Sequence, residues 1–174
     1  MPVTNLDKGF LWVGQGYLWL LPMPVVVFLA VLVLAWVVLY RMKFGRYVYA
    51  VGGNARSARI SGINTGFVIF MVYVISGFLS ALGGILLTAR TSAGLPQAGQ
   101  SYELDAIAAV VIGGTSMTGG RGSLLGTLMG ILLIGVINNG LDLLGVSSYY
   151  QQVVKGLIIV GAVMLDYFQS DHDR

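Results

Sequence analysis

The chain has 174 residues, of which 56% are hydrophobic and 10% are charged, with a mean hydropathy of +0.83 and a net charge of +3 at pH 7. Soluble domains carry roughly 25% charged residues, so this composition excludes an ordinary water-soluble fold and indicates a membrane protein. The chain contains no cysteine, which excludes disulfides and thiolate metal sites, and its one histidine, His172, has no neighbouring ligand pattern.

The first predicted element, residues 1–22, is an external segment at the membrane interface. Trp12, Tyr17 and Trp19 lie there among glycine and proline residues. Amphipathic aromatic side chains concentrate at the level of the lipid headgroups. The alternative is that this segment is the beginning of a longer, broken span.

Four stretches are apolar enough to cross a bilayer, which takes about 20 residues. They are residues 23–40, 66–89, 123–144 and 152–168. Between the second and the third lies 103–120, whose apolar core is short; it is either a short fifth span or a re-entrant half-helix followed by a glycine-rich turn. The predicted fold is therefore an all-α polytopic membrane protein with four to five transmembrane helices, forming a single transmembrane domain over 1–174.

The basic residues predict the orientation, because positively charged loops face the cytoplasm. If all five segments cross, Lys8, Arg90 and Lys155 lie on one side, and the other side holds Arg41, Lys43, Arg46, Arg56, Arg59, Arg121 and Arg174. This distribution predicts an external N-terminus and a cytoplasmic C-terminal tail, 169–174. If 103–120 is re-entrant, Arg121 and the tail change sides, but the loop 41–64 stays in the cytoplasm.

The loop 41–64 contains signals for a short helix. Asn54 is a favourable N-cap and Gly62 is typical of the position just past a helix end, which predicts a helix over about 55–61. Arg56 and Arg59 are three residues apart and share one face. A helix this short is marginal in water, so it needs a docking surface: anionic lipid headgroups or a partner protein.

Small residues recur at helical spacing in two of the predicted spans. They are Gly77, Ala81 and Gly84 in the second span, and Gly122, Gly126 and Gly130 at the beginning of the span 123–144. Small residues let helix backbones approach closely inside a membrane. These faces are therefore predicted to pack against other helices rather than against lipid alone.

The motif IGGTSMTGGRGS, residues 112–123, has the glycine spacing of a phosphate-binding loop but lacks the lysine and the Ser/Thr that such a loop requires. If the protein uses ATP, another chain must bind it. The sequence has no Ser–His–Asp set, no suitably paired carboxylates and no metal cluster, so we expect no catalytic residue, metal or cofactor. Nothing in it indicates nucleic acid binding.

Asn138 and Asn139 are the candidates for contact with a solute. They lie in the second half of an apolar segment, where polar groups are costly and usually face a bundle interior or a watery cavity. Asparagine amides offer both donors and an acceptor to a hydroxylated solute. Hydrogen bonding between helices is the alternative role.

Several blocks together carry a family resemblance: GRYVYAVGGNARSARISGIN at 45–64, and YELDAIAAVVIGGTSMTGGRGS with the stretch that follows it to about residue 159. The chain resembles the membrane permease subunit of bacterial ABC importers for monosaccharides, the ribose, xylose and galactose type, which is related to branched-chain amino-acid permeases. The resemblance runs from about residue 10 to about residue 168.

The resemblance implies three partners in the bacterial inner membrane and around it. An ATP-binding cassette subunit would dock on the loop 41–64, at Asn54, Ala55, Arg56, Ala58, Arg59 and Gly62. A periplasmic sugar-binding protein would present solute near 90–104 and 141–150. A second permease copy would complete the transport path.

Permeases of this type are roughly twice as long, and the chain resembles their C-terminal half. We therefore expect a truncated gene, a mis-assigned start or a split subunit, with a missing N-terminal half as a further partner. A branched-chain amino-acid or other small-solute permease is one alternative function. A carrier that is not driven by ATP, or a purely structural membrane fragment, is another.

Overall fold

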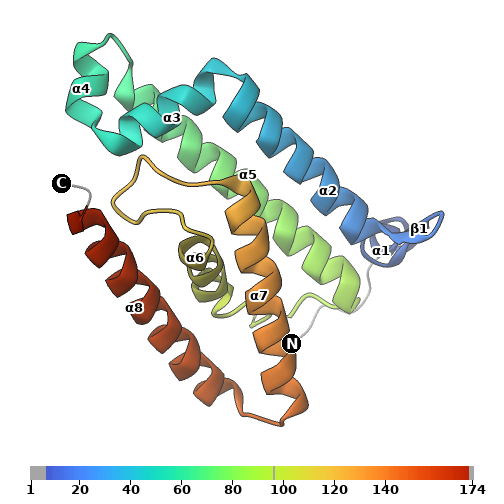
Figure 1. Ribbon diagram of the computed structural model, residues 1–174. Helices are drawn as coiled ribbons and strands as arrows, with labels where there is room; N and C mark the ends of the chain where they lie inside the picture. Colours follow the sequence, from blue (N-terminus) through green and yellow to red (C-terminus); the bar gives the residue numbers. More distant parts are fainter. Residues whose placement is uncertain (1–6, 96, 173–174) are drawn as a thin grey trace. The chain divides into compact units, whose positions relative to one another are not determined.

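The computed structural model describes residues 7–95 and 97–172, and these are predominantly helical (Figure 1). The predicted all-α class is confirmed. The described residues form two compact units, and each is presented by itself. The first takes in the chain up to Val48 together with Arg56–Gln100, and the second takes in Tyr49–Ala55 together with the chain from Ser101 onward. The single transmembrane domain over 1–174 stays a prediction.

The first unit is dominated by long apolar helices with little buried surface. Its elements are α1 (Lys8–Gln15), the two-stranded antiparallel hairpin β1 (Tyr17–Leu18) and β2 (Leu21–Pro22), α2 (Met23–Trp36), a π-helix η1 (Val37–Arg41), the beginning of α3 (Lys43–Gly53), most of α4 (Ala55–Ile60), and α5 (Thr65–Thr91). Neither α2 nor η1 contains a buried residue. Their apolar side chains are therefore available to lipid.

The N-terminal segment packs as a short helix against the end of α5. Gly14 lies so close to Ala89 that no side chain would fit between them. The Gln15 Nε2 donates hydrogen bonds to the Arg90 carbonyl oxygen at 3.2 Å and to Ser92 Oγ at 2.6 Å. A hairpin separates α1 from α2, so the two helices do not form one continuous span. The external position of 1–22 stays a prediction.

The second unit is built around a short central helix. It consists of the end of α3, α6 (Tyr102–Ile112), α7 (Leu124–Leu143) and α8 (Ser148–His172), and α6 packs between α7 and α8 (Figure 1). Ala108, Ala109 and Ile134 form its small buried core, with Ile112 and Ile159 packed against it. Because α6 presents mainly alanine and valine, its neighbours can lie close to its backbone.

Within the described part of the chain, three helices are long and apolar enough to cross a membrane: Met23–Arg41, Thr65–Thr91 and Leu124–Leu143. They match three of the predicted spans to within two residues. The fourth, 152–168, lies within α8, a 25-residue helix whose first turns are polar. The helix in the doubtful stretch 103–120 has 11 residues, so at 1.5 Å per residue it covers about 16 Å, roughly half of the hydrocarbon layer.

Candidate functional site

A buried polar cluster joins the three helices of the second unit. Asp105 on α6 forms an ion pair with Lys155 on α8, with 2.7 Å between Asp105 Oδ1 and Lys155 Nζ. The Asn138 Nδ2 on α7 donates a hydrogen bond to Asp105 Oδ2 at 3.3 Å. The Lys155 and Asp105 side chains are only 9% and 20% exposed. Charges this well removed from water are costly unless they are paired, so each of these partners depends on the others.

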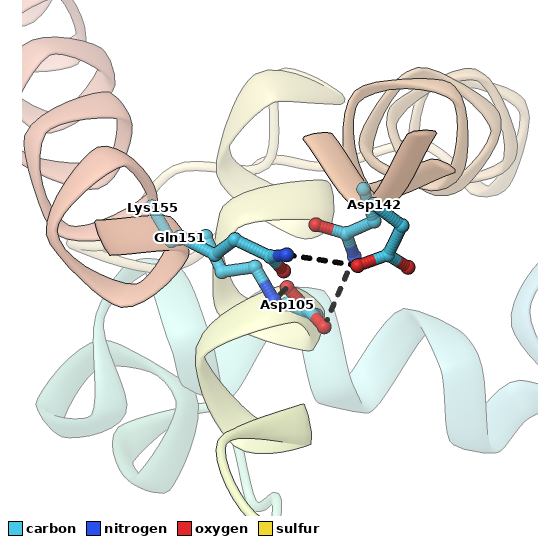
Figure 2. Close-up of polar contacts among 5 residues, drawn as sticks. Asp105, Asp142, Gln151 and Lys155 are labelled. Atoms are coloured by element: carbon cyan, nitrogen blue, oxygen red, sulfur yellow. Dashed lines mark hydrogen bonds and ion pairs between the residues drawn. The ribbon is translucent and has the colours of Figure 1, made fainter. Parts of the chain in front are cut away.

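A second polar pair lies one helical turn away, near the end of α7 and the beginning of α8. Gln151 Nε2 donates a hydrogen bond to Asp142 Oδ1 at 2.8 Å (Figure 2). It also donates to the Val146 carbonyl oxygen at 3.0 Å. Asp142 follows Asn138 by four residues, and Lys155 follows Gln151 by four, a spacing that places each pair on one helix face. The polar contacts between α7 and α8 therefore run from an exposed outer pair to the buried cluster around Asp105.

A cavity of about 320 Å³ opens beside the cluster, between α6 and α7. Its walls are mostly apolar, and Asp105 and Asn138 supply its polar groups; it is lined by Asp105, Ala106, Ala109, Val110, Ile131, Ile134, Gly135 and Asn138. Asn138 Oδ1 is buried and has no hydrogen-bond partner among the described residues. An unsatisfied amide oxygen at the polar end of an apolar cavity is an acceptor for a hydroxyl or N–H group.

Sequence reasoning found part of this cluster. Asn138 lines the cavity, whereas the neighbouring Asn139 is exposed elsewhere on α7. Asp105 and Lys155 were not expected to be partners. The available signal is that Lys155 lies at the beginning of one apolar stretch and that Asp105 follows Glu103 at the beginning of another, and charges in apolar helices usually face a partner inside the bundle.

The two predicted small-residue faces have different surroundings. On α7, a side chain at Gly130 would collide with the Ala109 carbonyl oxygen, and one at Gly126 with the Gly113 carbonyl oxygen. Gly122 precedes α7, and a Cβ there would lie 2.9 Å from the Thr115 side chain. Because of these contacts, α7 lies antiparallel to α6. Asp105 at the beginning of α6 therefore lies next to Asn138 late in α7. On α5, Gly77, Ala81 and Gly84 are exposed, with open space next to both glycines.

The predicted helix in the loop 41–64 is present as α4, Ala55–Ile60, directly after Asn54. Gly62 follows it with φ +82°, a conformation that suits a glycine at a helix end. Arg56 and Arg59 are exposed, whereas Ala58 is 5% exposed. Here we call 41–64 the coupling segment, after its predicted role, which stays a prediction.

The end of α3 contacts the glycine-rich turn between α6 and α7, which we call the glycine turn (residues 113–122). Tyr49 Oη donates a hydrogen bond to the Gly122 carbonyl oxygen at 3.1 Å. The backbone at Gly52 and Gly53 lies against the backbone at Gly119 and Gly120. Within the described residues, no group of three or more His, Asp or Glu side chains could hold a metal ion.

The chain has extensive similarity to known proteins. A model of the branched-chain amino acid transport system / permease component family matches residues 2–163. The chain is 53% identical over 171 residues to the ribose import permease protein RbsC of Bacillus subtilis (strain 168). The aligned region covers 97% of this chain and 53% of the relative.

Two relatives from Escherichia coli (strain K12) show the same partial coverage. The chain is 50% identical over 157 residues to the ribose import permease protein RbsC, covering 90% of this chain and 49% of the relative. It is 40% identical over 169 residues to the galactose/methyl galactoside import permease protein MglC, covering 95% and 50%. The chain thus spans about half the length of the curated relatives it matches. No solved structure shows significant similarity to it.

Proposed function

Because the chain belongs to the branched-chain amino acid transport system / permease component family, we propose that it is the membrane-embedded translocation subunit of an ATP-driven monosaccharide importer. The observation that carries this proposal is the 53% identity to a ribose import permease over almost the whole chain. The three apolar helices of spanning length agree with a subunit that lines a path through the membrane.

The relatives are about twice as long as the matched region. We therefore propose that the transport path includes further protein beside this chain, either a second permease copy or a chain equivalent to the remainder of these relatives. The exposed small-residue face of α5, at Gly77, Ala81 and Gly84, suits such a neighbour because it would allow a close helix approach.

The coupling segment is proposed to dock on a separate ATP-binding cassette subunit. Arg56 and Arg59 are exposed and basic, and they would steer and orient an acidic or polar partner surface. Asn54, Ala55, Ala58 and Gly62 shape the short helix between them and would permit close approach. Anionic lipid headgroups would attract the same two arginines, and the experiment below separates these two roles.

The proposed orientation has the N-terminus outside and the C-terminus in the cytoplasm of a bacterial inner membrane. The contact between the end of α3 and the glycine turn supports it. We propose that this contact lies outside the hydrocarbon layer, where segments that touch share one side of the membrane, so the glycine turn would lie on the cytoplasmic side with the coupling segment. The stretch 103–120 would then cross the membrane rather than re-enter it.

The cavity beside Asp105 and Asn138 is proposed to lie on the solute path. Asp105 is neutralised by Lys155, so the cluster has no net charge and suits a neutral, hydroxylated solute. Asn138 Oδ1 would accept a hydrogen bond from a sugar hydroxyl. Asn139, on another face of α7, is assigned to the path only through its position next to Asn138. A periplasmic sugar-binding protein would deliver the solute near 90–104 and 141–150.

A second candidate function follows from the family description, which names branched-chain amino acids. An amino acid would present an ammonium and a carboxylate group to the path, and the neutral cluster around Asp105 offers neither of them an unpaired opposite charge. Inhibition of uptake by excess D-ribose or D-galactose, but not by L-leucine, would favour the sugar importer.

The test of the proposed function is retention of the ATP-binding cassette subunit encoded beside this chain. The wild-type chain should co-purify with that subunit. The amount of ATP-binding subunit that co-purifies with the Arg56→Glu/Arg59→Glu variant should be at least ten-fold lower, because both exposed charges are reversed. Arg90→Glu, at an exposed arginine on the opposite predicted side, is the matched control and should retain it fully.

Equal retention by the wild type and the double variant would remove the two arginines from the docking surface. If the wild type retains no ATP-binding subunit but binds anionic vesicles in a manner that the double variant abolishes, the coupling segment is a lipid-binding element. In that case an ATP-driven importer is the wrong assignment.

A further inference from the structure

The closest part of the contact between α3 and the glycine turn, at Gly52–Gly53 and Gly119–Gly120, is made by backbone atoms. A Cβ built on Gly120 would lie 2.6 Å from the Gly53 Cα, and one built on Gly52 would lie 2.8 Å from the Gly120 backbone N. A Cβ on Gly119 would lie 2.5 Å from the Gly52 carbonyl oxygen. Real Cβ atoms do not approach other heavy atoms so closely, so two backbones lie directly against each other. Movement of the backbone at Gly52–Gly53 must therefore either displace the backbone at Gly119–Gly120 or open the contact between them.

The glycine turn is attached firmly to α6. Gly113 N–H donates to the Ala109 carbonyl oxygen at 2.9 Å, and Thr115 N–H donates to the Val110 carbonyl oxygen at 3.1 Å, so hydrogen bonding continues past the end of the helix. At its other end the turn is held by the hydrogen bond from Tyr49 to Gly122. A displacement of residues 49–53 therefore reaches α6 with little flexible chain in between.

The opposite end of α6 carries Asp105, which is paired with Lys155 and Asn138. Asp105 lies eight residues before Gly113, where the glycine turn begins, so the polar cluster and the turn are about 12 Å apart along α6. One short helix thus connects the coupling segment to the cavity lined by Asp105 and Asn138.

We propose that the backbone contact between Gly52–Gly53 and Gly119–Gly120 transmits movement of the coupling segment to α6, and through α6 to the polar cluster on the solute path. The inference rests on the proposed function, since it supplies the step between docking of the ATP-binding subunit and rearrangement of the path. Gly52, Gly53, Gly119 and Gly120 are positioning residues: they act through α6 and touch no solute.

The chain offers a matched pair of glycines to test this. Gly120 has φ +75° and Gly114 has φ +78°, so alanine at either position experiences the same left-handed backbone strain. Only Gly120 faces α3, whereas Gly114 has no atom within 4 Å of its built Cβ. A difference between Gly120→Ala and Gly114→Ala therefore reports the contact and not the strain.

The first measurement needs no partner and tests the contact itself. Amide hydrogen exchange is measured on the purified full chain in nanodiscs of phosphatidylethanolamine and phosphatidylglycerol. Gly120→Ala should raise the exchange rate of residues 49–53 at least ten-fold, while Gly114→Ala should leave it within two-fold of the wild type. Equal exchange rates in the two variants would mean that the contact does not hold residues 49–53, and the proposal would be overturned.

The second measurement tests transmission in cells that depend on this chain for uptake. Radiolabelled D-ribose and D-galactose are supplied, and co-purification of the ATP-binding subunit is measured in parallel. Gly120→Ala should keep the subunit bound but reduce uptake at least ten-fold, with Gly114→Ala within two-fold of wild type. Equal uptake by both variants, with the contact opened in the exchange experiment, would overturn the transmission role. A wild type that neither binds the subunit nor takes up sugar would instead overturn the proposed function.

Discussion

At the residue scale, the ion pair between Asp105 and Lys155 has a large energetic consequence. The two side chains are largely removed from water, so their desolvation is offset only while they remain together. Asn138 donates a hydrogen bond to one carboxylate oxygen of Asp105, and Lys155 forms the ion pair with the other oxygen. The cluster therefore fixes the relative position of α6, α7 and α8 and at the same time forms the polar end of the cavity.

Removing one charge of this pair should destabilise the chain far more than removing both. Asp105→Asn or Lys155→Met alone should lower the free energy of unfolding by about 3–5 kcal/mol, because an unpaired charge stays buried. The Asp105→Asn/Lys155→Met double variant should regain most of this loss. Unfolding by titration with SDS in mixed micelles gives the three values. Asp142→Asn, in the exposed outer pair, is the control and should cost less than about 1 kcal/mol. Additive losses in the double variant would show that the two charges are not coupled.

At the element scale, much of the local structure could be predicted and the pairing of elements could not. The helix in the coupling segment begins directly after Asn54 and ends before Gly62, because capping preferences act within a few residues. The ion pair joins residues 50 positions apart on different helices. The sequence shows that both charges lie in largely apolar helical stretches. Which helix faces bring them together depends on the packing at Gly126 and Gly130, and hydrophobic periodicity does not predict that packing.

The packing of α7 on α6 depends on glycine at position 130. Gly130→Ala should lower the free energy of unfolding by about 1–3 kcal/mol, because the new Cβ would collide with the Ala109 carbonyl oxygen and push the helices apart. Gly140 lies on the same helix, and a Cβ built on it would have no neighbouring atom within 4 Å. Gly140→Ala should therefore be neutral or stabilising by up to about 1 kcal/mol, the helix preference of alanine over glycine. The same SDS titration compares them, and equal stabilities would contradict close packing at Gly130.

At the scale of the whole molecule, the chain is a polytopic membrane protein of a permease family that spans about half the length of its relatives. Its long helices α2 and α5 bury few of their side chains within the described residues. Such surfaces are satisfied by lipid and by further helices. The proposed importer consequently needs a second permease chain as well as an ATP-binding subunit, and all of its coupling depends on the coupling segment lying in the cytosol.

The sidedness of that segment can be measured directly, because the chain contains no cysteine and an introduced one is the only thiol. Ile60 in α4 is 82% exposed, and Leu20 in the N-terminal hairpin is 88% exposed. With a membrane-impermeant maleimide, the Leu20→Cys variant should be labelled in intact cells, and the Ile60→Cys variant only after the membrane is permeabilised. Labelling of Ile60→Cys in intact cells would contradict the account, since an ATP-binding subunit in the cytosol could not reach the coupling segment.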